Sequence, residues 1–128
     1  MSHGSPGVPA DPRTPEEFFA GSATGQAIHD AVAAVVAGLG PHEVRVSRSQ
    51  VAFRRRRGFA YLWRPERYLR SDVPAVLSVA LPEPWDSPRF KESVRLAHLW
   101  MHHLEVLSAA EIDDEVRGWL RAAYDAAG

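Results

Sequence analysis

The sequence has no cysteine, a single lysine and only two methionines among its 128 residues. Without cysteine there is no disulfide framework, no thiolate nucleophile and no zinc site built on cysteine. No apolar run approaches the roughly 18 residues that span a bilayer, and the N-terminus lacks the basic-then-apolar pattern of a signal peptide. We therefore expect no membrane association and a cytoplasmic location.

What remains is the composition of an ordinary globular domain, with 45% hydrophobic and 24% charged residues and a net charge of -1. This length suits one domain with one core. We expect residues 1–13, rich in proline and glycine, to be a disordered tail and residues 14–127 to form a single domain. Charge is uneven, because residues 44–70 hold nine arginines and one glutamate, whereas the stretches on either side are acidic overall.

Helices are predicted at both ends of this domain. Residues 14–17, Thr-Pro-Glu-Glu, form a capping box that starts a short helix ending near Gly21. A second helix should begin at Ser22 or Thr24 and reach about Leu39, since its apolar residues recur at three- and four-residue steps. Residues 108–111 form another capping box, which predicts the start of a C-terminal amphipathic helix.

The middle of the chain alternates apolar and polar residues, which predicts strands. We place five of them at about residues 44–46, 51–53, 59–63, 73–81 and 94–106. The links between them are too short for crossover helices, so neighbouring strands should run antiparallel. The predicted fold class is therefore α+β, a largely antiparallel sheet of about five strands packed by N-terminal and C-terminal helices.

Three blocks of sequence carry a resemblance to a known family. They are the stretch from Val46 to Pro65, the run Trp100-Met101-His102-His103, and the segment from Trp119 to Tyr124. Together they resemble DUF5655, a bacterial domain of unknown function, over most of residues 14–127. The resemblance implies no established activity, and so it assigns no catalytic residue.

Arginine is the most conspicuous residue of the central block. Guanidinium groups suit phosphate and carboxylate oxygens, and interleaved aromatic residues are typical of surfaces that bind single-stranded nucleic acid. The leading hypothesis is a small non-enzymatic module that holds an anionic partner, either nucleic acid or a phosphorylated small molecule. The candidate anion-binding residues are Arg48, Arg54, Arg55, Arg56, Arg57 and Arg64. The competing interpretation is that these arginines are solvated and the aromatic residues belong to the core.

A second hypothesis is an enzyme or small-ligand protein with a pocket on one side of the sheet. Its candidate lining residues are Ser49, Gln50, Tyr61, Trp63, His102 and His103. No glycine-flanked nucleophile elbow surrounds the serines, and no cluster of carboxylates stands out. We therefore assign no catalytic residue and leave open whether the protein is an enzyme.

The histidines of residues 94–106 do not predict a metal site. On one strand His98 and His102 would lie about 13 Å apart, too far to share an ion. We expect no metal and no cofactor, with His102 buried and Glu105 placed to pair with His103.

A third hypothesis concerns assembly. If both long helices pack on one face of the sheet, the other face would expose Phe59, Tyr61 and Trp63. Such a face could be covered by a second copy of the chain, giving a homodimer, or could form the pocket instead.

Overall fold

The computed structural model describes residues 11–67 and 70–128 and has the predicted α+β architecture. The helices are α1 (Pro15–Phe18), α2 (Ala23–Leu39) and α3 (Asp114–Ala126), with short 3-10 helices η1 (Pro65–Arg67) and η2 (Ala109–Glu111). The strands are β1 (Glu43–Val46), β2 (Val51–Arg54), β3 (Gly58–Trp63), β4 (Ala75–Leu81), β5 (Phe90–Leu96) and β6 (Leu99–Val106). They form one antiparallel sheet in the order β1-β2-β3-β4-β6-β5.

The sheet has six strands where five were expected, because the single strand predicted over residues 94–106 is wrong. That segment is a hairpin of β5 and β6, turning at Ala97 and His98. Ala97 adopts the left-handed conformation, with φ of 56°. The residues at every second position are Val94, Leu96, His98 and Trp100, and the single histidine in this series did not reveal the turn. His98 consequently lies in the turn and not on a strand face beside His102.

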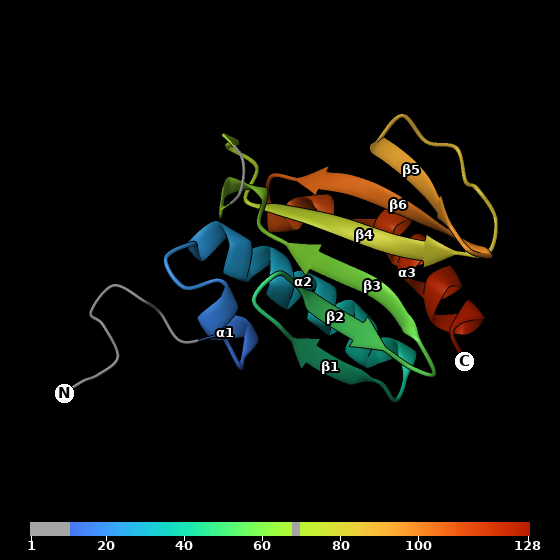
Figure 1. Cartoon of the computed structure of the whole chain (residues 1–128), viewed down its shortest axis with the longest axis horizontal. Coiled ribbons are helices and arrows are strands. Elements are labelled where there is room, and N and C mark those ends of the chain that lie inside the picture. Colours follow the sequence, from blue (N-terminus) through green and yellow to red (C-terminus); the bar gives the residue numbers. More distant parts are fainter. Residues whose placement is uncertain (1–10, 68–69) are drawn as a thin grey trace.

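Both long helices lie on the same face of the sheet (Figure 1). Helix α2 begins as predicted, with the Ser22 hydroxyl accepting a hydrogen bond from the Gly25 amide at 3.0 Å. Helix α3 packs on β3 and β4 and contacts α2. The core lies between these helices and the sheet, and its largest members include Phe18, Phe53, Leu62, Leu77 and Leu120. We call this covered side of the sheet the helix face and the opposite side the open face.

The C-terminal helix starts later than the second capping box predicted. Ser108 makes no capping hydrogen bond with its side chain, and residues 109–111 form η2 instead. Asp113 caps α3, since its carboxylate accepts a hydrogen bond from the Val116 amide at 3.1 Å. That bond, with a further contribution from Arg89, holds the pKa of Asp113 below its usual value.

The arginine-rich hairpin between β2 and β3 is fastened to the end of α3. Arg55 donates to the Tyr124 carbonyl at 2.9 Å and lies 4.0 Å from the centre of the Tyr124 ring. Arg57 donates to the Ala126 carbonyl at 2.8 Å. The last carbonyls of a helix have no partner within the helix and carry partial negative charge, so cations bind there favourably. We call this pair of contacts the arginine clamp.

We expect Arg55→Ala and Arg57→Ala each to lower the free energy of unfolding by about 1–2 kcal/mol, since each removes a charge-assisted hydrogen bond. Arg56→Ala is the matched control, because only the backbone amide of Arg56 bonds to α3, at 3.1 Å from the Ala127 carbonyl. Urea denaturation measures all three. Equal destabilisation by all three substitutions would show that the clamp side chains contribute nothing specific.

Candidate functional site

Strand register places four chemically distinct side chains in one row across the open face. Tyr61 pairs with Ser78, Ser78 with His103, and His103 with Glu92. Directly opposite residues of antiparallel strands project on the same side, about 5 Å apart. The centre of the open face therefore carries a phenol, a hydroxyl, an imidazole and a carboxylate in sequence.

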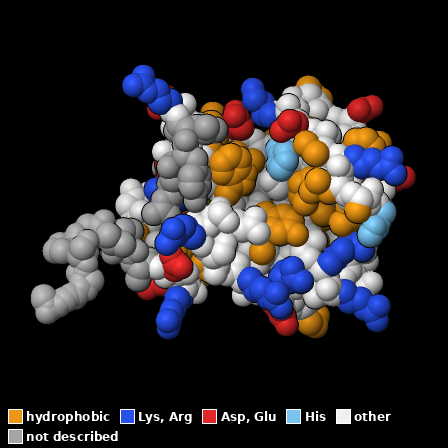
Figure 2. All heavy atoms as spheres, in the orientation of Figure 1, with side chains coloured by type: hydrophobic (Ala, Val, Ile, Leu, Met, Phe, Trp, Pro, Cys, Tyr) orange, Lys and Arg blue, Asp and Glu red, His pale blue; other side chains and the backbone are white. Residues whose placement is uncertain are grey.

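The open face is hollowed around this row. The hollow has a volume of about 540 Å³ and combines polar groups with apolar walls. Figure 2 shows hydrophobic side chains gathered around a histidine on this face, with basic side chains along one border. The lining residues are Ser49, Gln50, Tyr61, Trp63, Ser78, Val94, Leu96, Met101 and His103. We call this site the open-face hollow.

Ser78 and His103 form the tightest polar contact in the hollow, with 2.6 Å between the Ser78 hydroxyl and His103 Nδ1. Ser78 is only 4% exposed, whereas His103 is half-buried. Burial lowers the pKa of His103, although the nearby Glu92 carboxylate partly offsets this. The imidazole is therefore neutral at pH 7.

Tyr61 connects the hollow to the basic side of the sheet. Its hydroxyl lies directly over Gly58, where an added Cβ would collide with the phenol. Gly58 pairs with Arg54 on the neighbouring strand, so the hydroxyl end of Tyr61 lies beside that arginine. Glycine at position 58 thus leaves room for the ring to extend from the hollow toward Arg54.

Five of the six residues proposed from the sequence for a pocket line this hollow. The exception is His102, which faces the helix side and is fully buried. Its Nε2 accepts from the Trp85 amide at 3.0 Å, so Nδ1 carries the proton and faces the Val79 carbonyl at 3.3 Å. His102 therefore fixes the loop before β5 against the core and takes no part in the hollow.

Phe59 also does not lie on the open face, where the sequence pattern had predicted it. A bulge between β2 and β3 shifts the register there, and Phe59 packs edge-on against Tyr124 of α3 with ring centres 5.4 Å apart. It is fully buried. The aromatic surface of the open face therefore consists of Tyr61 and Trp63 alone among the three residues expected.

The six candidate arginines do not form a single cluster. Besides the two clamp residues, Arg64 is buried and donates to the carbonyls of Phe18 and Ala20, both at 3.0 Å. Arg64 also pairs with Glu66 at 2.8 Å, and Arg48 pairs with Asp11 at the same distance. Within the described part of the chain, the side chains of Arg54 and Arg56 have no hydrogen-bond partner.

One further prediction is corrected by the described contacts, and another lies largely outside the described residues. Glu105 lies 4.0 Å from Lys91 and does not pair with His103. The tail predicted over residues 1–13 falls largely outside the described residues, although Arg13 donates through its amide to Glu17 at 2.7 Å.

Sequence reasoning missed Ser78, Val94, Leu96 and Met101 as lining residues. A signal existed for Ser78, which is the one polar residue of the otherwise apolar β4. The other three were missed because the side of the sheet on which they lie depends on the hairpin turn at Ala97, which the alternating pattern did not predict.

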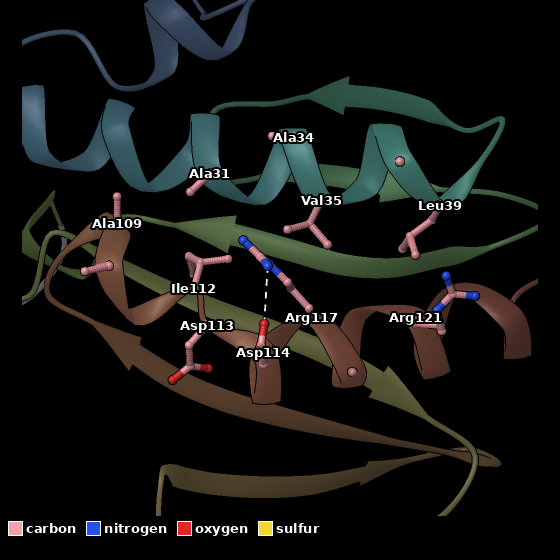
Figure 3. Close-up of a pocket in the computed structure, with 13 residues that line it drawn as sticks. Ala31, Ala34, Val35, Leu39, Ala109, Ile112, Asp113, Asp114, Arg117 and Arg121 are labelled. Carbon is pink, nitrogen blue, oxygen red and sulfur yellow. Dashed lines mark hydrogen bonds and ion pairs between the residues drawn. The ribbon is translucent and has the colours of Figure 1, made fainter.

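A larger cavity, of about 860 Å³, lies between α2 and α3 (Figure 3). Its walls are mostly small apolar side chains, such as Ala31 and Ala34. Of the charged groups at its rim, Arg117 contacts Asp114 at 3.3 Å and Asp113 contacts Arg89 at 3.0 Å, whereas Arg121 makes no ion pair among the described residues. This groove offers little specific chemistry to a ligand.

Within residues 11–67 and 70–128, no three His, Asp or Glu side chains are grouped so that they could hold a metal ion. Among the same residues, no helix is both long and apolar enough to cross a bilayer.

A family model for a domain of unknown function, DUF5655, matches residues 16–127. The chain belongs to the DUF5655 family. No curated protein and no solved structure shows significant similarity to it. Membership in DUF5655 thus supplies no activity, and the chemistry of the site has to come from the geometry above.

The lowered pKa of His103 predicts that the folded protein loses stability as the pH falls below about 6.5, the ordinary pKa of histidine. In that range the unfolded chain binds the proton more readily than the folded one, so stability rises with pH. His103→Gln should flatten this dependence, whereas His98→Gln in the exposed turn should not. Urea denaturation at several pH values tests it, and an unchanged slope in His103→Gln would contradict the assignment.

Proposed function

We propose that this DUF5655 protein is a binding module for a small molecule with a planar ring, held in the open-face hollow. The observation that carries the proposal is the convergence of an aromatic wall with a half-buried, oriented imidazole in one concave site. Ligand sites typically combine apolar and aromatic walls with a few placed polar groups in about 300–1,000 Å³. The volume of about 540 Å³ lies within that range.

The walls favour a ring as the part of the ligand that enters. Tyr61 and Trp63 offer ring faces, and Met101 offers a polarizable sulfur that packs well against aromatic groups. Around them, Ser49 and Gln50 supply hydroxyl and amide groups from the β1–β2 turn. These groups can orient a ligand by hydrogen bonds at the edge of its ring.

Binding explains the Ser78–His103 pair better than catalysis does. A serine nucleophile needs oriented donors to stabilise the oxyanion that forms on attack. Ser78 lies in β4, whose backbone pairs with β3 on one side and β6 on the other, so its neighbouring amides are committed to the sheet. Its low exposure further limits attack on a substrate.

The arginines have different partners, which weakens the case for a nucleic-acid surface at the hairpin. A surface of that kind needs several free cations beside stacking rings. Here the clamp arginines bind α3 and Arg64 is buried. An anionic partner remains part of the proposal only where basic groups border the hollow.

The proposal is tested with 2-naphthol as a neutral planar probe, followed by protein NMR. We expect chemical-shift changes confined to the lining residues. Met101→Trp, which fills the hollow, should weaken binding at least about tenfold, since it displaces the ring from its apolar contacts. Ala34→Trp, which makes a bulky change of the same kind in the α2–α3 groove, is the control and should leave binding unchanged.

Two results would overturn this function. One is shift changes centred on α2 and α3, which would place the site in the other groove. The other is light scattering that gives a dimer mass with the hollow protected from 2-naphthol, since a second copy would then cover the open face.

A further inference from the structure

We infer that the natural ligand of the open-face hollow is an aromatic anion. Its ring lies against Tyr61, its negatively charged oxygen group faces Arg54, and a second group of the ligand accepts a hydrogen bond from His103. This inference rests on the proposed function and specifies its ligand class. It depends on three features of the described residues: the tautomer of His103, the position of Arg54 and the distribution of charge across the open face.

The hydrogen-bond network fixes which nitrogen of His103 carries the proton. A neutral imidazole has one N–H. If Nδ1 carried it and donated to Ser78, the Ser78 hydroxyl proton would be buried with no acceptor among the described residues. Buried polar groups are nearly always satisfied, so Ser78 donates to Nδ1. Nε2 then carries the proton and is the polar atom left for a ligand, which must offer an acceptor.

Arg54 is the basic group best placed to meet a charge. It follows Ala52 by two positions on β2 and lies on the open face, and it pairs with Gly58, over which the Tyr61 hydroxyl lies. Its Nε is buried and lacks a hydrogen-bond partner in the described part of the chain, as does the Nε of Arg57. A ligand cannot reach a nitrogen that has no exposed surface, so an anionic oxygen at this border would bond to the terminal guanidinium nitrogens of Arg54.

Charge is distributed unevenly across the open face. Arg45 lies opposite Ala52, so Arg45 and Arg54 both lie on the Tyr61 side of the open face, next to the residues that line the hollow. Glu43 lies opposite Arg54 and contacts Arg45 at 3.5 Å, but both side chains of that pair are about two-thirds exposed, so the pair is weak. Glu92 and Glu105 lie on the far side, on β5 and β6, with Lys91 4.0 Å from Glu105. The β1–β2 side therefore carries one net positive charge and the β5–β6 side one net negative charge. The resulting field orients an anion toward β2 and away from β5.

The test uses three naphthalene probes whose substituents differ in charge: 2-naphthoate (anionic), 2-naphthamide (neutral) and 2-naphthylmethylammonium (cationic). We expect 2-naphthoate to bind at least about tenfold more tightly than 2-naphthamide at low salt, because a charge-assisted hydrogen bond replaces a neutral one. The preference should shrink as salt is raised. Arg54→Gln should remove most of it, and Arg56→Gln at the exposed hairpin tip should not.

A second pair of variants tests the tautomer. His103→Phe removes the donor and should weaken 6-hydroxy-2-naphthoate, whose hydroxyl oxygen is a second acceptor, more than 2-naphthoate, whose single carboxylate faces Arg54. His103→Gln keeps an N–H donor and should restore much of the affinity. Circular dichroism and urea denaturation establish that each variant is folded before its affinity is compared.

The outcomes separate the two proposals. Equal binding of 2-naphthoate and 2-naphthamide, or tighter binding of the ammonium probe, overturns the anion inference and leaves the proposed function standing. Failure of all three probes and of 2-naphthol to bind the hollow overturns both. A carboxylate preference that survives Arg54→Gln shows that another cation supplies the charge and overturns the role of Arg54.

Discussion

The structure depends above all on the fact that its helices cover only one face of the sheet. Alternate residues of every strand therefore meet two different environments. On the helix face the strands contribute Leu77, Val79 and Leu104 to a continuous apolar core. On the open face the same strands contribute Ser78 and His103, which no helix covers. A site forms there because polar side chains remain partly accessible above a rigid central strand.

The arginine clamp helps to position the strands of the open face although it lies away from the hollow. By binding the end of α3, Arg55 and Arg57 hold the hairpin that carries Gly58. The Tyr124 hydroxyl donates to the Pro41 carbonyl at 2.9 Å, which ties the loop before β1 to the same helix end. The first three strands are thereby fixed relative to α3, and with them the position of Tyr61. Two of the arginines predicted to bind an anion thus also hold in place the strands that carry the candidate hollow.

Much of the fold could be read from the sequence, because caps and alternation are local signals. Ser22 and the end of α2 at Leu39 were predicted closely, as were the hairpin at residues 55–58 and an uncovered sheet face. The turn at Ala97 was missed because it preserves the alternation, and the start of α3 was misplaced because Asp113 caps more effectively than Ser108. Most of the pocket set was also predicted, since Tyr61 and Trp63 alternate in phase. The partners of individual side chains could not be predicted, because the contacts of Arg64 with Phe18 and of Ser78 with His103 depend on tertiary packing.

The two adjacent histidines of β6 show how the same residue type meets different environments on the two faces of a sheet. His102 and His103 are adjacent in sequence and so project to opposite faces. His102 has both ring nitrogens engaged by backbone groups, which leaves nothing for a ligand. His103 has one nitrogen engaged, by a hydroxyl that receives no other described hydrogen bond. The number of committed ring nitrogens, together with burial, therefore distinguishes His102, which completes the core, from His103, whose Nε2 is left for a ligand under the proposed function.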